Sequence, residues 1–296
     1  MDYLDLKKKI IISLIFIICL FSLSYWIYGK FYVSTDDAYV GADVVQISPQ
    51  VTGKVKNLYV SNNQYVTTGE LLFDLETEIY DAALLEAQAG LLVSEAKLKI
   101  AQLTKDRTIE LARQKAASYQ ENDIAIGNLE AAIAQRNINQ ALVTKAELNL
   151  QYTKIRAYTS GWVANMTLQV GDSVTGHQPL FALVSDKKFW IDANFKETEL
   201  EHVRVGQKVD IKIDMYPNQD FHGVVEIFSS GTGNAFSLLP PENATGNWVK
   251  ITQRVPVRIL IINNDFHQPL RIGTSALVTI HTSLLSRRAK NINEHK

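Results

Sequence analysis

Cysteine is almost absent from this chain of 296 residues: Cys19 is the only one. A single cysteine cannot form an intramolecular disulfide, so the long segment after it must be held by packing alone. Ile18 precedes Cys19, whereas a lipoprotein signal needs a small residue there. A lipid anchor on this cysteine is therefore not expected.

Proline is absent from positions 50 to 178, although it occurs at 49, 179, 217, 240, 241, 256 and 269. A proline in a helix interior costs about 3 kcal/mol, so a proline-free segment of this length permits long helices.

The chain also has no excess of charge of either sign, because it contains 30 basic and 31 acidic residues. No basic patch interleaved with aromatic residues occurs. Nothing in the composition therefore points to nucleic acid as a partner.

The motifs of catalysis are missing as well. The six histidines show no HExxH or i, i+4 pairing that suits a metal, and His177 falls in a predicted exposed turn. GTGNAFS at 231–237 lacks the Lys-Ser/Thr ending of a P-loop, and no G-x-S-x-G stretch exists. A structural or interface role is favoured for the pair Asp36 and Asp37. We expect no enzymatic activity, no catalytic residue, no metal and no cofactor.

The N-terminus holds the one long apolar run. Residues 1–9 end in three lysines, and residues 10–29 are twenty uncharged residues. This length matches the roughly 20 residues that cross a bilayer, and the preceding lysines orient the N-terminus toward the cytoplasm. A cleaved signal peptide is the alternative, but the run is too long and no A-x-A-like site follows. We expect a single-pass anchor with Tyr25, Trp26 and Tyr28 at its outer interface.

An internal repeat with a spacing of 108 residues connects VTGKVKNLYV at 51–60 with TSGWVANMTL at 159–168. Aligned without a gap, eight residues in a window of 25 are identical. The pairs are Gly53/Gly161, Val55/Val163, Asn57/Asn165, Val66/Val174, Thr67/Thr175, Leu72/Leu180, Phe73/Phe181 and Leu75/Leu183. Two halves of one β-module, residues 44–76 and 157–185, are predicted to pack together.

The intervening residues 77–156 show heptads typical of a coiled-coil hairpin. Leu84, Leu91 and Leu98 recur at seven on a first helix from Glu78 to about Ser118, as do Ala87, Ser94 and Ala101. On a second helix, from about Ile124 to Tyr152, we expect one face to hold Ile126, Leu129, Ile133, Ile138, Leu142 and Val143. The turn is predicted at about 119–127, where Asn122, Asp123 and Gly127 are turn formers. A solvated bundle or an intermolecular coiled coil is the alternative, but neither would bring the two β-halves together.

Short strands separated by Gly, Asn or Pro clusters follow, and they predict a small β-barrel over residues 186–283. Residues 34–43 are expected to add a strand to it, and residues 284–296 form a polar tail. The predicted fold is thus mixed α+β and elongated. It consists of a transmembrane helix, a lipoyl-like β-module split by an antiparallel α-helical hairpin, and a membrane-proximal β-barrel. A lipoyl carrier would need a lysine at a tight turn between the halves, and the hairpin replaces that turn, so no covalent cofactor is expected.

Four stretches resemble the EmrA-type branch of the HlyD-like membrane fusion proteins. They are TDDAYV at 35–40, VTGKV at 51–55, DANFKETEL at 192–200 and GTGNAFSLLPPENATGNWVKITQRVPVRI at 231–259. The resemblance implies a periplasmic adaptor in the inner membrane of a Gram-negative bacterium. Such an adaptor forms a ring and joins a major-facilitator-type transporter to a TolC-like outer-membrane channel, for export of drugs or other small hydrophobic or aromatic compounds. The hairpin is shorter than this branch usually has and closer to that of aromatic carboxylic acid efflux adaptors.

Two further sets of residues follow from the resemblance. Related adaptors dock on the channel through an Arg, a Leu four residues later and a Ser seven beyond that; here Arg113 is followed by Ala117 and Ile124, so the motif is not kept. Docking at the tip is a hypothesis for Arg113, Tyr119, Asp123, Ile124 and Gly127. Contact with the transporter or with a neighbouring protomer is a hypothesis for Phe236, Leu238, Leu239 and Trp248, which could instead be barrel core.

Two other functions stay open at this point. The same architecture serves adaptors of ABC-type (type I) secretion systems, and a sensor or tether without transport could also share it. The EmrA-like stretch at 231–259 favours drug efflux over both.

Overall fold

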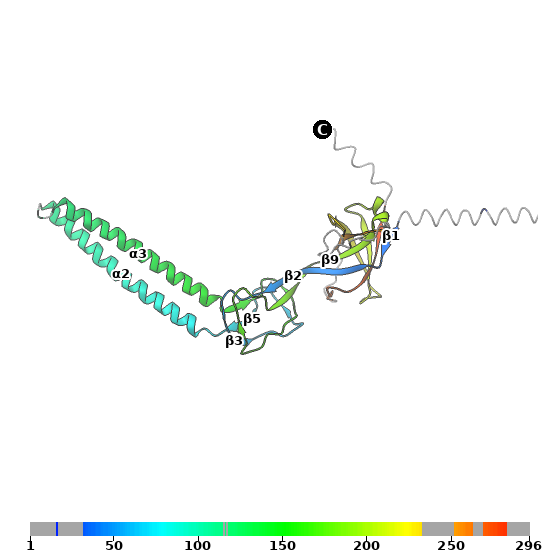
Figure 1. The fold of residues 1–296 in the computed structure, drawn as a ribbon, viewed down its shortest axis with the longest axis horizontal. Coiled ribbons are helices and arrows are strands. Elements are labelled where there is room, and N and C mark those ends of the chain that lie inside the picture. Colours follow the sequence, from blue (N-terminus) through cyan, green and yellow to red (C-terminus); the bar gives the residue numbers. More distant parts are fainter. Residues whose placement is uncertain are drawn as a thin grey trace, which may run out of the picture. The chain divides into compact units, whose positions relative to one another are not determined.

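The computed structural model describes residues 16, 32–114, 116, 118–232, 252–262 and 269–282. Val44–Ser185 form one compact unit, and the described residues up to Asp43 and from Asp186 onward form the other. Figure 1 shows the strands and helices and labels several of them.

The β-part of the first unit is built from two interlocked halves. The strand β3 of the first half pairs with β8 of the second, and β4 of the first half pairs with β7 of the second, all antiparallel. Each half therefore completes the sheet of the other. The strands are β3 (Gly53–Leu58), β4 (Tyr65–Val66), β5 (Leu71–Leu75), β6 (Lys154–Arg156), β7 (Gly161–Ala164), β8 (Ser173–Val174) and the beginning of β9 (Phe181–Lys196).

The repeated apolar residues of both halves share one core. Phe73 and Phe181 occupy equivalent positions of the repeat, and their rings lie 6.1 Å apart inside this core. Val55, Val66, Val163 and Val174 are buried around them, as the repeat predicted. Burying one such side chain contributes roughly 1.5–3 kcal/mol, and neither half could bury its set alone.

Between the halves runs a helical hairpin made of α2 (Glu78–Arg113, 36 residues) and α3 (Tyr119–Gln151, 33 residues). At 1.5 Å per residue α2 is about 54 Å long. The two helices lie side by side and antiparallel in Figure 1.

The hairpin turn lies earlier than the predicted 119–127, so that prediction is wrong. The helix α2 ends at Arg113 and α3 begins at Tyr119, so Asn122, Asp123 and Gly127 are helical residues of α3. The cause is a capping box at Ser118: its hydroxyl accepts a hydrogen bond from the Glu121 N–H, and the Glu121 carboxylate accepts one from the Ser118 N–H. These bonds satisfy donors that a helix N-terminus leaves unpaired and outweigh the turn preference of the following Asn and Asp.

The base of the hairpin, where α3 ends, also lies slightly before the predicted limit at residue 156. The helix α3 ends at Gln151, and β6 already pairs with β5 from Lys154 to Arg156. The second half-module therefore begins before residue 157.

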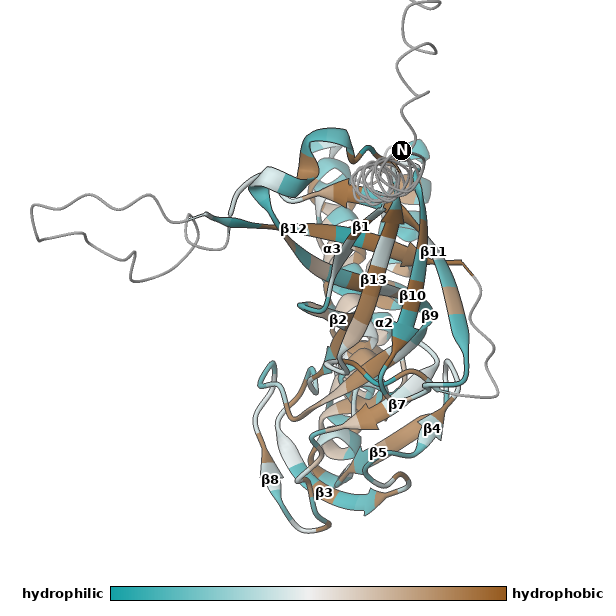
Figure 2. Ribbon diagram, turned by 90° about the vertical axis from the view of Figure 1, so that its right-hand side faces the viewer, coloured by the Kyte–Doolittle hydropathy of each residue, from teal (hydrophilic) through white to brown (hydrophobic). Residues whose placement is uncertain are grey.

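The second unit is an antiparallel sheet whose strands alternate between buried and exposed residues, as in the pattern of β10. Figure 2 shows hydrophobic and hydrophilic residues alternating along these strands. The strand order β13-β10-β11-β12-β9 is completed by β1 on β13 and by β2 on β9. Since β1 and β2 are consecutive in the chain, they close the sheet into a barrel. The strands are β1 (Tyr32–Thr35), β2 (Ala38–Ile47), β9, β10 (Lys208–Ile213), β11 (Asp220–Phe228), β12 (Arg254–Ile261) and β13 (Ala276–His281), with the 3-10 helix η1 (Glu197–His202) after β9.

Several predicted features fall outside the described residues, among them the N-terminal residues 1–9 and the polar tail 284–296, and two of them concern function. These are the apolar span 10–29, of which only Phe16 is described, and the loop residues Phe236, Leu238, Leu239 and Trp248. Within the described part of the chain, no helix combines the length and the apolar character that crossing a bilayer requires.

Candidate functional site

The seam of the hairpin on α2 follows the predicted heptads. Leu84, Leu91 and Leu98 are half-buried against α3, together with Ala87 and Ala101, and Ser94 is buried. The same spacing continues through Lys105, Thr108 and Ala112, so this prediction is confirmed and the seam reaches the tip.

The predicted face of α3 is mostly wrong. Ile126, Ile133, Ile138 and Leu142 are exposed, and only two of the six predicted residues lie in the seam. The seam instead contains Asn122, Ala125, Leu129, Ala132, Arg136, Asn139, Val143, Ala146 and Leu150. Alanines at positions seven apart were the signal in the sequence, because small residues let two helices approach closely while larger ones remain outside.

Polar contacts connect the two helices across this seam. The Asn139 side-chain amide donates a 3.0 Å hydrogen bond to the Gly90 carbonyl, and Arg136 pairs with Glu95 at 3.8 Å. Near the base, the Tyr80 hydroxyl donates a 2.6 Å hydrogen bond to the Thr52 carbonyl and ties α2 to the β-module.

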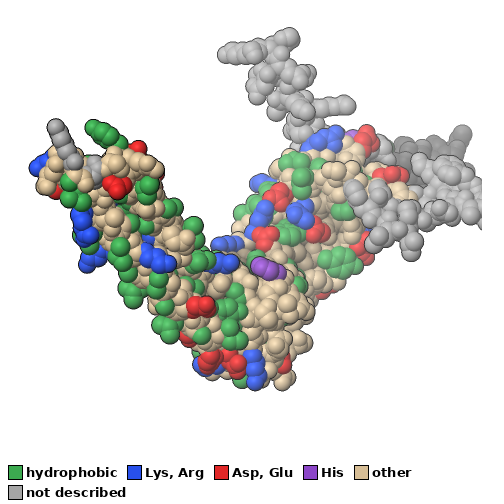
Figure 3. Space-filling model, turned by 60° about the vertical axis from the view of Figure 1, so that its left-hand side comes forward, with side chains coloured by type: hydrophobic (Ala, Val, Ile, Leu, Met, Phe, Trp, Pro, Cys, Tyr) green, Lys and Arg blue, Asp and Glu red, His purple; other side chains and the backbone are tan. Residues whose placement is uncertain are grey.

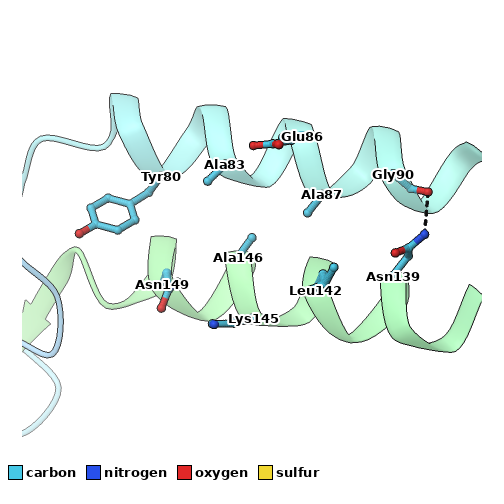
Figure 4. A pocket seen from close by; sticks show the side chains of 10 residues that line it. All are labelled: Tyr80, Ala83, Glu86, Ala87, Gly90, Asn139, Leu142, Lys145, Ala146 and Asn149. Atoms are coloured by element: carbon cyan, nitrogen blue, oxygen red, sulfur yellow. Dashed lines mark hydrogen bonds between the residues drawn. The ribbon is translucent and has the colours of Figure 1, made fainter. Parts of the chain in front are cut away.

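A groove of about 400 Å³ lies along the seam at the base of the hairpin (Figure 4). Small residues of α2 and α3 leave this space, and polar side chains including Asn139 and Lys145 line it. Its lining contains no nucleophile–base pair, so the groove offers a contact surface rather than a reaction centre.

Many large apolar side chains are exposed on both helices of the hairpin. Figure 3 shows hydrophobic side chains distributed along the outside of the hairpin, between charged ones. On α2, Ile79 is 80% exposed and Leu92 69%, and on α3, Ile138 is 55% exposed. Large exposed apolar side chains in such numbers favour contact with a protein partner. The members of this outward apolar surface are Ile79, Leu85, Leu92, Val93, Ile100 and Leu103 on α2, and Ile124, Ile126, Ile133, Ile138, Leu142 and Leu148 on α3.

The structure brings the five predicted docking residues together at the tip. Arg113 is the last residue of α2, with its side chain 80% exposed and 3.6 Å from Glu110. Tyr119 begins α3 and is 89% exposed, and Asp123, Ile124 and Gly127 are exposed on its first turns. A Cβ on Gly127 would meet no atom within 4 Å, so the backbone does not require this glycine.

A network in the barrel unit joins three of the stretches that carry the family resemblance. The Asp37 carboxylate accepts hydrogen bonds from Arg254 at 2.7 Å and from the Asn194 side chain at 3.1 Å. Thr35 adds a 2.9 Å hydrogen bond to the Asn194 carbonyl. The favoured structural role of Asp37 thus has a geometric basis, although sequence reasoning did not find its partners.

A second cluster lies beside it on β9 and β12. The Arg258 guanidinium lies 4.5 Å from the centre of the Trp190 ring. Arg258 Nε donates a 3.1 Å hydrogen bond to the Asp192 carboxylate, and Trp190 Nε1 donates one of 2.8 Å to the same carboxylate. Gly41 of β2 allows the indole to lie close, since a Cβ there would come within 2.4 Å of Trp190 Nε1. Trp190 Nε1 and Arg258 Nε both donate to the Asp192 carboxylate within the barrel wall, which favours a structural role.

One carboxylate of the barrel binds two imidazoles. Asp210 contacts His281 Nε2 at 2.5 Å and His222 Nδ1 at 3.1 Å, and the hydrogen bond from His281, more than that from His222, lowers the Asp210 pKa below its ordinary value. The described residues contain no group of three side chains arranged to hold a metal ion. His177 is exposed in a turn, as predicted, with a positive φ of 65°.

Two family models match the chain. Residues 43–186 match the barrel-sandwich hybrid domain of RND membrane fusion proteins, and residues 188–281 match the AAEA-like beta-barrel domain. Among curated proteins, the multidrug export protein EmrA of Haemophilus influenzae is 36% identical over 94% of this chain and 85% of its own length. The fatty acid resistance protein FarA of Neisseria gonorrhoeae is 33% identical over 84% of this chain and 76% of its own length.

Solved structures share the fold. A MacA–MexA chimeric protein, which contains the Pseudomonas aeruginosa MexA α-hairpin domain, aligns with a TM-score of 0.64 and 23% identity. The alignment covers 86% of this chain and 82% of that one. The membrane fusion protein Spr0693 of Streptococcus pneumoniae aligns with a TM-score of 0.63 and 17% identity, over 85% of this chain and 99% of that one.

Proposed function

This chain belongs to the EmrA-type branch of the membrane fusion protein family, and from that premise we propose that it is the periplasmic adaptor of a drug efflux pump. Such an adaptor catalyses no bond chemistry. It connects a transporter in the inner membrane with an exit channel and encloses the path between them.

The single observation that carries this proposal is the exposed apolar surface of the hairpin. A hairpin that only stabilised itself would place its large apolar side chains in the seam, where Leu84 and Leu98 are half-buried. Here side chains as large as Leu85 and Ile100 face outward, and a protein partner that covers them accounts for their number.

The proposed partners differ along the chain. The tip residues, among them Tyr119 and Ile124, would contact a TolC-like outer-membrane channel. The loop residues Phe236 and Leu238 would contact a major-facilitator-type transporter or a neighbouring copy. Residues 10–29 would anchor the chain in the inner membrane with the N-terminus in the cytoplasm, and the transporter's ion gradient would supply the energy.

Self-association is part of the proposal, because one hairpin cannot enclose a path. A ring of copies would bury the outward apolar surface between neighbouring hairpins. Heterologous contacts that close on themselves generate such rings from identical subunits.

Site-specific photocrosslinking in cells tests the proposal. A photoreactive residue at Asp123 should capture a channel protein, and one at Phe236 should capture a multi-span transporter. The matched control at Lys154, exposed at the far end of the hairpin from the tip, should capture neither. Capture of nothing at 123, combined with capture of other copies alone at 236, would contradict the adaptor function.

A further inference from the structure

The anchor proposed for residues 10–29 limits where one end of the barrel unit can lie. The strand β1 begins at Tyr32, three positions after Gly29, the last residue of the apolar run. Because an extended chain spans at most about 3.6 Å per residue, the Cα atoms of Gly29 and Tyr32 lie within about 11 Å of each other. An anchor that spans the bilayer therefore holds the start of β1 at the bilayer surface.

Strand pairing brings further residues to the same end of the barrel. The strands β1 and β10 are both antiparallel to β13, so they run in the same direction and both begin at this end. Tyr32 is paired with His281, and the pairing of Val209 with Ile280 places Lys208 beside His281. Tyr32, His281 and Lys208 thus form a row across three neighbouring strands, which Figure 2 shows side by side.

A tight turn precedes β10 and so lies beyond this row, at the end of the barrel. The Gln207 N–H donates a 3.3 Å hydrogen bond to the Arg204 carbonyl, and Gly206 has a φ of +88°, which glycine adopts without strain. The Gln207 side chain supports the turn, since it accepts from the Arg204 N–H at 2.9 Å and donates to the His202 carbonyl at 3.1 Å. Val205 stands at the corner of this supported turn and is 61% exposed.

A second exposed apolar side chain lies next to this turn. The Gly206 N–H donates a 2.8 Å hydrogen bond to the Val225 carbonyl of β11. Since β11 is antiparallel to β10, its following residues lead toward the same end, where Ile227 is exposed. Val205, Ile227 and the exposed Tyr32 thus place apolar and aromatic side chains at this end. Exposed aliphatic side chains bind favourably at the boundary of a bilayer, and tyrosine is enriched there.

Two cations flank Val205 in the sequence, and neither forms an ion pair with any residue that the structure describes. The Arg204 guanidinium donates to the main-chain carbonyls of Glu201 and Val203, at 2.8 and 2.6 Å, and the Glu201 carboxylate does not pair with it. Lys208 is exposed. Cationic side chains close to a membrane surface attract anionic phospholipid headgroups.

We propose that this end of the barrel docks on the surface of the bilayer that holds the anchor. Val205 enters the headgroup region, Ile227 and Tyr32 lie at its boundary, and Arg204 and Lys208 lie beside phospholipid phosphates. The inference deepens the proposed function and rests on it in requiring that residues 10–29 span the bilayer. Two points, the anchor and the turn, then hold the barrel on the membrane, which restricts tilting of the barrel about the anchor.

The other end of the same barrel offers a matched comparison. The turn before β13 repeats the pattern of Arg, an apolar residue and Gly: the Thr274 N–H donates to the Arg271 carbonyl at 3.4 Å, Gly273 has a φ of +81°, and Ile272 is exposed. Since β13 is antiparallel to β10, this turn lies at the opposite end of β10. The six residues of β10 separate the two levels by about 20 Å. Ile272 is therefore the control for Val205, because the two share turn geometry and exposure but not position.

Fluorescence quenching in phospholipid vesicles that contain this chain and no other protein tests the inference. An environment-sensitive fluorophore is attached to Val205→Cys or to Ile272→Cys in the full-length chain carrying Cys19→Ser. The vesicles contain phospholipids with a nitroxide near the headgroup. Quenching at Val205→Cys should exceed that at Ile272→Cys several-fold, with emission shifted to shorter wavelength. Equal quenching at both positions, or none at Val205→Cys, would overturn the inference.

Flotation of the same vesicles separates this result from a failure of the anchor. A chain that floats with the vesicles but shows no quenching at Val205→Cys keeps the anchor and loses the bilayer contact. A chain that does not float would refute the anchor and this inference together. In cells, a photoreactive residue at position 205 identifies a competing occupant. Capture of a transporter or of another copy there would overturn the lipid contact while supporting the adaptor function.

The lipid composition tests the part played by the cations. Because each cation near an anionic surface contributes to binding, quenching at Val205→Cys should be at least about twofold stronger with phosphatidylglycerol in the vesicles than with phosphatidylcholine alone. Lys208→Gln should remove much of that difference. Lys212→Gln, which changes an exposed lysine near the other end of β10, should preserve it. Equal quenching in both lipids would overturn the contact of Arg204 and Lys208 with phosphates.

Discussion

The Asn139 side-chain amide donates a hydrogen bond to the main-chain carbonyl of Gly90 across the hairpin, over 3.0 Å. Asn139 occupies a seam position, where an apolar residue would pack equally well in several alignments of the two helices. A polar residue at such a position specifies the register at some expense in stability. This contact therefore favours the alignment of the two helices in which Asn139 lies opposite Gly90.

Replacing Asn139 by Ala should lower the free energy of unfolding by about 1 kcal/mol, the net value of one such hydrogen bond. Thermal unfolding of the full-length chain in detergent, followed by helical circular dichroism, measures this. Gly90→Ala serves as the matched variant: a Cβ at Gly90 would meet no atom within 4 Å and the carbonyl is retained. That change should stabilise the helix by about 0.5–1 kcal/mol. Equal destabilisation by both changes would contradict the role of the hydrogen bond.

The capping box at the tip yields a second prediction. Ser118→Ala removes the hydroxyl that accepts the Glu121 N–H and should destabilise the hairpin by about 1 kcal/mol. Hydrogen exchange of the first turn of α3 should rise most, because fraying begins at the lost cap. Gln120→Ala, at an exposed position of the same turn, is the control and should change little. If Ser118→Ala left both stability and exchange unchanged, the tip would not be held by this cap.

The third prediction concerns the ion pair between Asp37 and Arg254 in the barrel. The Asp37 side chain is only 29% exposed, so removing its cation leaves a partly desolvated carboxylate. Arg254→Ala should therefore destabilise the barrel by about 1–2 kcal/mol, and Arg254→Lys, which keeps the charge, by less. Lys208→Ala, which removes an exposed cation elsewhere in the barrel, is the control and should stay within about 0.5 kcal/mol. Urea unfolding of the native chain and the three variants measures these changes in the free energy of unfolding. Equal destabilisation by Arg254→Ala and Arg254→Lys would contradict a contact that depends on charge.

The sequence predicted those parts of the fold that a regular pattern of apolar residues indicates without ambiguity. The repeat predicted the shared core because Phe73 and Phe181 carry the same pattern, and the heptad of Leu84 appeared within one helix. The seam of α3 could not be read in this way, because the largest residues of that helix, such as Ile138, face outward. Apolar residues recur with helical spacing in a seam and also on a surface that a partner would cover. The spacing in the sequence alone therefore does not tell the two surfaces apart.

The candidate site shows the same limit. The tip residues could be proposed because they lie near one turn of the chain, although the turn itself was misplaced. The contact of Asp37 with Arg254 joins residues 217 positions apart, and no local pattern announces such a pair. The capping signal Ser118-x-x-Glu121 was present in the sequence, and it would have placed the start of α3 correctly.

The fourth prediction is a pH dependence that arises from Asp210. Its pKa lies below the ordinary value of 3.8 in the folded chain, chiefly because His281 donates a hydrogen bond to the carboxylate. A lowered pKa stabilises the fold at pH values above 3.8, and that stabilisation is lost as the pH falls through the lowered value. The side chain is half-exposed, so solvent screening keeps the effect below about 1 kcal/mol.

Comparison of the native chain with Asp210→Asn by urea unfolding tests this effect. At pH 7 the variant should be slightly less stable, and the difference should shrink toward zero as the pH is lowered below 3.8. Asp43→Asn, which removes an exposed carboxylate elsewhere, is the control and should change the free energy of unfolding at pH 7 by less than about 0.5 kcal/mol. A difference at Asp210 that is independent of pH would mean that its charge does not contribute.

The fifth prediction separates the two glycines that the internal repeat aligns. At Gly161, φ is +153° and a Cβ would come within 2.0 Å of the Val184 carbonyl oxygen. Backbone atoms of β9 cannot move aside without breaking the pairing of β7 with β9. At Gly53, a Cβ would lie 3.3 Å from side-chain atoms of Leu75, which can shift slightly. Gly161→Ala should therefore destabilise the β-module by about 3 kcal/mol or more, and Gly53→Ala by about 1 kcal/mol.

Thermal unfolding of both variants, with Gly90→Ala as a glycine change that meets open space, gives the comparison. The order of stability should be Gly90→Ala, then Gly53→Ala, then Gly161→Ala. Equal losses at Gly53 and Gly161 would mean that the two halves of the repeat accommodate a side chain in the same way. The predicted inequality arises because the halves, though similar in sequence, are not equivalent in three dimensions. The backbone of β9, which continues from the second half into the barrel, crowds only Gly161.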